Sequence, residues 1–462
     1  MTAPFVLFLL TILFALLALA LRNNPMLASL FTAFGAAFIA IFVLLAPIDA
    51  PVAIFGLSVK ISGTWSELGR SLILDPNTRP MVGYLYLAGA FMLSAGWIVR
   101  TTRFLNPIGM LILGVLAGSL MVKPFLFAAI FLEIAALGAV LLLVTARYPA
   151  KTGALRLLTL YTLAMMAILV TGWLLEITGV TEATPDLAQR ATFLLAFGFA
   201  ILMAVPPMHL WLPRAADEAH PYVVVFVAIL LQGSGLFFLF RFLDAYPWLR
   251  ESSTFFNALR MAGVVTAIFG GIMAVSQRSL KKFMAYALIA DLGVMLIAVG
   301  LGTTEGFKLA LGLSGVRVIS LSMWALSLSR LKMIQNQANF IGVAYRMPLV
   351  AAGLVVGIFS LAGFPLTAGF PGRWSLLLSL SIVDNLAAWS VILVLALIVA
   401  RGLIWTRSFL QPGEMDSNKQ ANVIERVYFA GGVVIVILLG VFPQLIYPWI
   451  IGVAAGMTHL FP

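Results

Sequence analysis

The chain contains no cysteine and only three histidines among its 462 residues. Disulfides, thiolate-ligated iron–sulfur clusters and cysteine-based zinc sites are therefore excluded, and we expect no haem or metal site held wholly by this chain. Charged residues are also scarce, at 10% of the sequence. We find no nucleophile elbow, P-loop or dinucleotide fingerprint in a strand–helix context. The sequence predicts no cofactor bound by this chain and no catalytic site of its own.

Apolar residues are what the chain has in abundance, at 62% of the sequence. Runs of about 20 apolar residues, the length that spans a bilayer as a helix, recur from end to end. We therefore predict an all-α polytopic membrane protein. The candidate segments are 3–21, 26–46, 80–99, 105–122, 124–146, 154–177, 191–208, 221–243, 257–276, 281–301, 307–330, 347–364, 374–400 and 428–452.

The net charge of +11 would suggest nucleic acid as the partner of a soluble protein. Here the basic residues lie mostly at the ends of apolar segments, as in membrane proteins that anchor to headgroups. We therefore predict a lipid bilayer as the surrounding medium and no nucleic-acid partner. Residues 51–62 alternate and are rich in β-branched side chains, which predicts a short strand or hairpin at one membrane face.

Two proline- and glycine-rich breaks interrupt the apolar segments, one within 206–220 and one at Gly363–Gly372. Unsatisfied backbone groups are costly in lipid, so irregular chain at membrane depth is tolerated only inside protein or beside a water-filled cavity. Broken helices of this kind usually line an ion or substrate path. The first break carries a cluster of polar residues: His209, Asp217, Glu218 and His220.

Charged residues also occur inside apolar segments, where each costs a few kcal/mol or more. Glu133 lies near the middle of 124–146, Asp291 lies within 281–301, and Arg317 lies within 307–330. Each is a candidate for function, and the alternative is a charge that only packs against a neighbouring helix. Arginine does not release its proton in practice, so Arg317 would bias or pair with a group such as Glu133 rather than relay protons.

Three further polar residues are candidates with a structural alternative. Lys281 precedes Asp291 by ten positions, and its spacing alone favours a basic interfacial loop. Arg373 opens the helix after the second break, where it either faces the interior or snorkels to the surface. Gln232 follows the first break and forms hydrogen bonds without carrying charge. Together these residues predict a polar axis suited to proton movement.

Three motifs carry a family resemblance: PPMHLWLPRAADEAHP, SQRSLKKFMAYALIADLG and SLAGFPLTAGFPGRW. They resemble the antiporter-like subunits of respiratory complex I (NADH:quinone oxidoreductase). That family includes Mrp-type cation/proton antiporter subunits and relatives in membrane-bound hydrogenases and inorganic-carbon uptake complexes. The resemblance implies about fourteen helices, two of them discontinuous, in inverted five-helix repeats. It implies N-terminal helices with an extramembrane hairpin, a first repeat, a second repeat and a C-terminal helix region at 1–104, 105–276, 277–410 and 411–462.

The family's proton path uses a glutamate on the fifth helix and lysines near the two breaks and the middle. Glu133 matches that glutamate, and Lys281 matches the basic position of the family motif LKRLLAY. The other positions depart from the family pattern. Lysine is replaced by Gln232, the histidine of Ser-His-Met-Gly by Asp291, the His-x-x-x-Lys pair by Leu313 and Arg317, and the lysine or glutamate after the second break by Arg373.

The sequence leaves three functions open. The first is a proton-translocating subunit of a redox-driven complex in a prokaryotic plasma membrane. Other membrane subunits would be its neighbours, and flavin, iron–sulfur clusters and quinone would belong to its partners. The second is a cation/proton antiporter subunit, moving protons or Na⁺, or a subunit of an inorganic-carbon uptake complex. The third is a scaffold whose proton path has degenerated, for which Gln232, Arg317 and Arg373 are the evidence.

Overall fold

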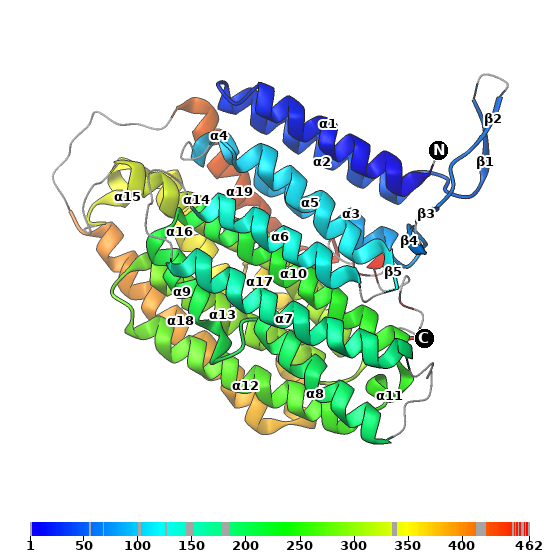
Figure 1. Ribbon diagram of the computed structural model, residues 1–462. Helices are drawn as coiled ribbons and strands as arrows, with labels where there is room; N and C mark the ends of the chain where they lie inside the picture. Colours follow the sequence, from blue (N-terminus) through cyan, green and yellow to red (C-terminus); the bar gives the residue numbers. More distant parts are fainter. Residues whose placement is uncertain are drawn as a thin grey trace. The chain divides into compact units, whose positions relative to one another are not determined.

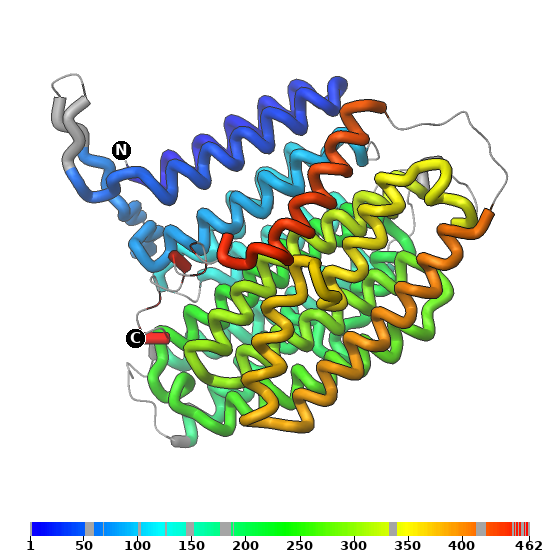
Figure 2. Tube along the Cα trace, turned by 180° about the vertical axis from the view of Figure 1, so that it is seen from behind, coloured from blue at the N-terminus to red at the C-terminus, as the bar shows by residue number. Residues whose placement is uncertain are grey.

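The structure is a computed structural model, and Figures 1 and 2 show it from opposite sides. It describes residues 2–54, 57–67, 69–99, 103–124, 127–144, 152–177, 185–334, 340–412, 422–445, 448, 450, 452–453, 457 and 459–460.

The described part of the chain is mostly helical, as predicted (Figure 1). Nine of its helices are long and apolar enough to cross a membrane. They are α1 (Ala3–Ala20), α2 (Pro25–Leu45), α7 (Thr152–Ile177), α10 (Pro221–Ala245), α12 (Ser253–Ser276), α13 (Leu280–Val299), α14 (Thr304–Ile334), α18 (Asn385–Leu410) and α19 (Val423–Val441).

Shorter apolar helices accompany them. These are α5 (Leu105–Met121), α6 (Ala128–Leu143), α8 (Pro185–Leu202) and α16 (Pro348–Leu361). The remaining helical elements are α3 (Arg79–Ser94), α4 (Gly96–Val99), η2 (Met208–Leu210), α9 (Trp211–Glu218), α11 (Pro247–Arg250), α15 (Val343–Arg346), α17 (Gly369–Val383) and η3 (Pro443–Leu445). The prediction of an all-α integral membrane protein is confirmed, whereas the count of fourteen spans and the inverted repeats stay predictions.

Five short strands lie outside the apolar helices. β1 (Pro51–Ile54) and β2 (Leu57–Lys60) pair as an antiparallel hairpin, which confirms the strand pattern predicted for 51–62. A second sheet has the order β3 (Thr64–Glu67), β4 (Arg70–Ile73) and β5 (Val122–Lys123). Because β5 directly follows α5, this sheet joins the segment before α3 to the connection between α5 and α6.

The chain divides into two compact units. Unit 1 comprises Met1–Met203, Leu230–Glu251 and Ile451–Pro462, and unit 2 comprises Ala204–Ile229 and Ser252–Ile450. The chain passes from one unit to the other within α10. The predicted boundaries at 105, 277 and 411 stay predictions.

Each unit is built from helices that pack along their length. In unit 1, α5 packs against α1 and α6, and α6 packs against α7 (Figure 1). In unit 2, α12 packs against α13 and α18, and α14 packs against α16. Glycine permits the closest approach: a Cβ atom on Gly293 of α13 would lie 2.4 Å from the backbone nitrogen of Ala267 on α12. Small residues at such contacts are typical of helix packing in membranes, where close backbone approach provides the attraction.

Candidate functional site

The first helix break lies between α8 and α10, where the sequence predicts it. α8 ends at Leu202, and Ala204 adopts a φ of 50°, in the left-handed region. The turn η2 and the short helix α9 follow before α10 begins at Pro221. Pro206 and Pro207 lack a backbone N–H, so a regular helix cannot continue through them.

The four polar residues predicted at this break occupy two kinds of environment. His209 and His220 are buried, with exposed fractions of 6% and 4%. Asp217 and Glu218 lie in the last turn of α9 and reach the surface in part. The Asp217 carboxylate lies 3.2 Å from the Nζ atom of Lys282. The acidic pair is therefore accessible, whereas the two imidazoles are enclosed.

Lys281 lies in the first turn of α13 and holds the end of α9 in place. Its Nζ atom donates hydrogen bonds to the carbonyl oxygens of Asp217 at 3.3 Å and Ala219 at 3.2 Å. The C-terminal end of a helix leaves carbonyl groups without intrahelical partners and carries partial negative charge. Lys281 is buried and thus anchors the broken helix through charge as well as through hydrogen bonds.

The second break lies between α16 and α17, inside the predicted range. α16 ends at Leu361, and both Gly363 and Leu366 then adopt positive φ values, 68° and 67°. α17 begins at Gly369, where a Cβ atom would lie 1.8 Å from the carbonyl oxygen of Ser360. The two half-helices therefore approach each other as closely as a residue without a side chain permits.

Asp291, Arg317 and Arg373 form a buried ionic triplet in unit 2. The Nη2 atom of Arg373 pairs with the Oδ1 atom of Asp291, and Nε of Arg317 lies 3.6 Å from the Oδ2 atom of the same carboxylate. Arg373 Nη1 also donates a hydrogen bond of 3.2 Å to the carbonyl oxygen of Gly369, at the second break. The exposed fractions of the three residues are only 2–4%.

The triplet unites the three positions Asp291, Arg317 and Arg373, which the motif resemblance in the sequence marks as departures from the family pattern. The resemblance implies a histidine at the first position and lysine or glutamate at the other two. One carboxylate between two guanidinium groups offsets part of the repulsion that two buried cations would otherwise create. Sequence reasoning singled out all three residues but not their mutual pairing, because they lie on three different helices, α13, α14 and α17.

Glu133 and Gln232 belong to unit 1. Glu133 on α6 is half-buried, and its Oε1 atom accepts a hydrogen bond of 2.7 Å from the hydroxyl of Thr162 on α7. Its Oε2 atom is buried and has no hydrogen-bond partner among the described residues. Gln232 on α10 has an exposed fraction of only 1%. The sequence suggested Glu133 as a partner for Arg317, but in the structure Arg317 pairs with Asp291.

Two ion pairs of unit 2 were missed by sequence reasoning. Arg330 Nη2 lies 2.8 Å from the Oε2 atom of Glu425, whose side chain is fully buried. Arg260 Nε lies 2.8 Å from the Oδ2 atom of Asp384. Arg260, Arg330 and Glu425 stand near the ends of predicted apolar segments, whereas Asp384 lies inside the predicted segment 374–400. The signal that distinguishes a buried pair from an anchor is tertiary packing, which no local pattern contains.

A small polar cavity of about 120 Å³ lies in unit 1. Arg241 lies near the end of the predicted segment 221–243, a position typical of headgroup anchors, yet it is only 7% exposed and lines this cavity. Asp75, Lys123 and Asp244 line it as well. Two basic and two acidic side chains thus balance each other in charge around the cavity.

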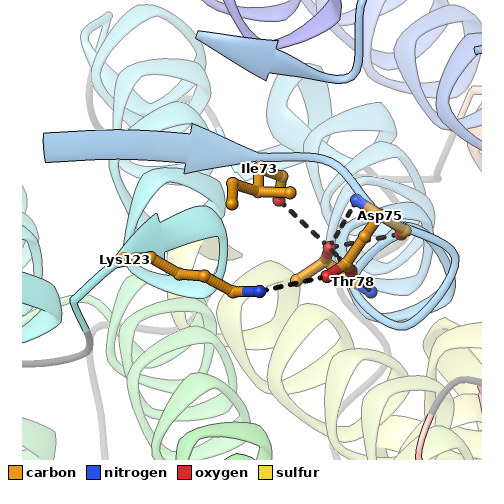
Figure 3. A network of polar contacts seen from close by, with 4 residues as sticks. All are labelled: Ile73, Asp75, Thr78 and Lys123. Carbon is orange, nitrogen blue, oxygen red and sulfur yellow. Dashed lines mark hydrogen bonds and ion pairs between the residues drawn. The ribbon is translucent and has the colours of Figure 1, made fainter. Parts of the chain in front are cut away.

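Asp75 is held by a local hydrogen-bond network (Figure 3). Its Oδ1 atom accepts hydrogen bonds from the backbone N–H of Thr78, at 2.8 Å, and from the Thr78 hydroxyl. Its Oδ2 atom lies 3.5 Å from Nζ of Lys123. Burial raises the pKa of the Asp75 carboxyl, but the Thr78 hydrogen bonds and the Lys123 charge together place that pKa below its ordinary value of 3.8.

Solved structures of three complexes contain a chain that resembles this one. One belongs to the membrane-bound sulfane sulfur reductase, an archaeal respiratory membrane complex, with a TM-score of 0.81 at 20% identity over 99% of this chain and 97% of the other. Another belongs to respiratory complex I of Thermus thermophilus, with a TM-score of 0.78 at 21% identity over 97% and 99%. A third belongs to the Mrp complex of Dietzia sp. DQ12-45-1b, with a TM-score of 0.80 at 19% identity over 98% and 52%. These likenesses show a shared fold.

Curated relatives point to the same group. The NADH-quinone oxidoreductase subunit N of Geotalea uraniireducens is 27% identical over 275 residues, 57% of this chain and 56% of the relative. The subunit of that name from Desulforudis audaxviator is 30% identical over 271 residues, 54% of this chain and 53% of the relative. The chain thus spans about half the length of the curated relatives it matches. The family model described as "NADH:quinone oxidoreductase/Mrp antiporter, TM" matches residues 125–400, more than half of the chain, and the protein belongs to that family.

Proposed function

We propose that the protein is the proton-translocating, antiporter-like subunit of a redox-driven membrane complex in a prokaryotic plasma membrane. The observation that carries this proposal is the set of buried charged groups placed at both helix breaks of a membrane-embedded family member. Charged residues at membrane depth are costly and typically mark ion or proton pathways. The shared fold with subunits of complex I and of an archaeal respiratory complex supports the same assignment.

In this proposal the proton path includes a titratable carboxylate in unit 1 and a polar centre in unit 2. Glu133 takes up and releases the proton, while the Thr162 hydroxyl orients its carboxylate. Gln232 supplies hydrogen bonds without charge. In unit 2, Lys281 stabilises the first break, and the Asp291 triplet supplies positive charge that does not vary with pH, because arginine keeps its proton.

The energy for translocation comes from partner subunits in this proposal. No three His, Asp or Glu side chains gather as a metal site within the part of the chain that the structure describes, and the chain has no cysteine to hold an iron–sulfur cluster. As the family resemblance implies, this proposal places flavin, iron–sulfur clusters and quinone in neighbouring chains. Other membrane subunits contact this chain, and protons, with Na⁺ as the alternative, are the ions moved.

The proposal is tested with Glu133→Gln in the intact complex, in inverted membrane vesicles. Proton uptake is followed with a pH-gradient dye while the redox reaction is started with the electron donor. We expect the variant to assemble but to lose coupled proton movement, because an amide cannot take up the proton. Asp186→Asn is the matched control, since Asp186 is exposed and pairs only at the surface with Arg190. Unchanged proton uptake in Glu133→Gln would remove Glu133 from the path.

A scaffold role is the second candidate, and the triplet itself favours it. Arg317 and Arg373 fix charge at positions where the family has groups able to titrate, and Gln232 removes a further one. A scaffold predicts that Glu133→Gln leaves both assembly and proton uptake of the complex unchanged. It also predicts that Asp291→Asn reduces the amount of assembled complex without changing the protons moved per electron pair in what remains. A change in that ratio would refute the scaffold role.

A further inference from the structure

The end of the short helix α9, at the first break, presents backbone oxygen atoms to α13. α9 ends at Glu218, and the backbone of Ala219 is then extended. The last carbonyl groups of a helix lack intrahelical partners and carry partial negative charge. α9 packs against α13 (Figure 1), and the carbonyl oxygens of Asp217 and Ala219 meet its first turn. Oxygen atoms at such half-helix ends are the groups that coordinate Na⁺ in many transporters.

An ammonium group of the chain itself is bound to these oxygen atoms. Nζ of Lys281 lies 3.3 Å from the carbonyl oxygen of Asp217 and 3.2 Å from that of Ala219, and Lys281 is only 8% exposed. An ammonium is a compact positive charge with three donors on a flexible stem. It therefore gives the two oxygen atoms what a bound metal cation would give them, a positive charge at short range.

The half-helix end at the second break is bonded in a different way. There the carbonyl oxygen of Ser360, near the end of α16, accepts a hydrogen bond of 3.1 Å from the backbone N–H of Gly363. The guanidinium of Arg373 lies at the same break and donates to the carbonyl oxygen of Gly369 at 3.2 Å. Fixed positive charge thus stands at both breaks, and at the first break it binds the carbonyl oxygens at the end of the half-helix.

We propose that Lys281 determines which ion the subunit moves, because its ammonium occupies a Na⁺ site at the first break and so selects protons over Na⁺. This inference rests on the proposed translocation function and removes its alternative ion. A Na⁺ ion that reaches the break is repelled by Lys281 and finds both carbonyl oxygens already bonded. A proton moves between titratable groups and water instead, and it needs no shell of oxygen ligands.

The test is thermal unfolding of the purified chain in detergent, in NaCl and in choline chloride at equal ionic strength. Lys281→Ala removes the ammonium and leaves the carbonyl oxygens free to bind an ion. A ligand that binds only the folded state raises the unfolding temperature as its concentration rises. We expect Na⁺ but not choline to stabilise Lys281→Ala, with Na⁺ binding at least about tenfold tighter than in wild type. A folded Lys281→Ala without Na⁺-specific stabilisation would overturn the proposal.

Lys282→Ala is the matched control, because it removes the same charge one position further along the chain. Lys282 pairs with the partly exposed carboxylate of Asp217 at 3.2 Å, and its loss leaves the bonds of Lys281 in place. We expect no Na⁺-specific stabilisation of this variant, nor of Lys281→Arg, which keeps a positive charge at the site. Equal stabilisation of Lys281→Ala and Lys282→Ala by Na⁺ would overturn the proposal, because it would show attraction by net charge alone.

A measurement on the wild-type complex keeps the proposal open to refutation if Lys281→Ala does not fold. Uptake of protons and of radioactive Na⁺ is followed in inverted membrane vesicles after the redox reaction is started, with Na⁺ or choline as the main cation. We expect equal proton uptake in the two salts and no redox-driven uptake of Na⁺. Uptake of Na⁺ by the wild-type complex would overturn the selection by Lys281. A complex that moves neither ion would refute the proposed translocation function alone, because the unfolding measurements do not depend on transport.

Discussion

Arg373 and Asp291 form an ion pair that connects two distant parts of the chain, 82 positions apart in the sequence. Both side chains are almost completely buried, at 2% and 1% exposure. The pair holds the helix that follows the second break against α13. Arg317 on α14 approaches the same carboxylate. One aspartate therefore links three helices of unit 2 through ion pairs.

The first prediction concerns the loss of that aspartate. Asp291→Asn removes the charge of the carboxylate with which both buried guanidinium groups pair, and breaking a buried pair in this way costs about 3–5 kcal/mol. We expect the free energy of unfolding of the purified chain in detergent to fall by that amount. Chemical unfolding, followed by the fluorescence of the tryptophans, measures it.

Replacing the whole triplet with apolar residues provides the control. Asp291→Leu, Arg317→Met and Arg373→Met together remove both the charges and the need to pair them, and such replacements are often neutral or stabilising. We expect the triple variant to be more stable than Asp291→Asn alone. A loss in Asp291→Asn as small as that in the exposed variant Asp186→Asn would contradict a buried triplet.

The second prediction concerns the close contact at the second break. Gly369→Ala places a methyl group 1.8 Å from the carbonyl oxygen of Ser360, and a backbone atom cannot move aside as a flexible side chain can. We expect a loss of at least about 2 kcal/mol in the free energy of unfolding. Gly233→Ala in α10 is the control, because no atom lies within 4 Å of its added Cβ. That control should gain about 0.5–1 kcal/mol, and equal effects at the two sites would refute the tight break.

The third prediction separates two adjacent lysines. Lys281→Gln removes a charged donor from two carbonyl oxygens at the end of α9, and hydrogen bonds to charged groups contribute about 1.5–3 kcal/mol. Lys282→Gln removes a partly exposed pair with Asp217, which is worth about 0–1 kcal/mol. Limited proteolysis and thermal unfolding compare the two variants. A larger loss from Lys282→Gln would contradict the anchoring role of Lys281.

The fourth prediction concerns the pH dependence of stability at Asp75. Its folded pKa lies below its ordinary value of 3.8, so the folded state binds a proton less readily than the unfolded state. The stabilisation is therefore complete above that ordinary value and is lost as the pH falls through the lowered pKa. Asp75→Asn should lower stability at pH 7 by about 1.5–3 kcal/mol.

The measurement is thermal unfolding of wild type and Asp75→Asn at pH values from 7 down to below the lowered pKa of Asp75. We expect the two curves to converge at the acid end, because the wild-type carboxyl is then protonated as well. Thr78→Val serves as a companion variant that removes only the hydroxyl donor and keeps the charge. A constant difference between wild type and Asp75→Asn over the whole range would show that the carboxylate charge contributes nothing.

The helix breaks and the hairpin were predictable from sequence because their causes are local. Pro206 and Pro207 remove backbone donors wherever they occur, and Gly363 adopts a positive φ at no steric cost. The alternation in 51–62 likewise reports strand geometry directly. These features therefore appear in the structure close to their predicted positions.

The pairings of the charged residues were not predictable, because they depend on which helices become neighbours. No pattern in the sequence around Asp291 indicates that Arg317 and Arg373 are its partners. Glu425 illustrates the same limit. It stands at the start of an apolar segment, as an anchor would, yet it is buried and pairs with Arg330, which lies 95 positions away in the sequence. Hydropathy locates such residues in the chain but contains no information on contacts between helices.

The triplet also limits the order in which single substitutions at these three positions can occur. The two end states are the present residues and the residues that the family resemblance implies. An aspartate introduced first between two basic residues meets charges that already favour it, so that step is tolerated. If Asp291 is replaced while Arg317 and Arg373 remain, both buried arginines lose the carboxylate with which they pair. The aspartate can therefore be the first of the three residues to appear, but it can be lost only after the two arginines have been replaced. Each of the three residues thus limits which substitutions are tolerated at the other two positions.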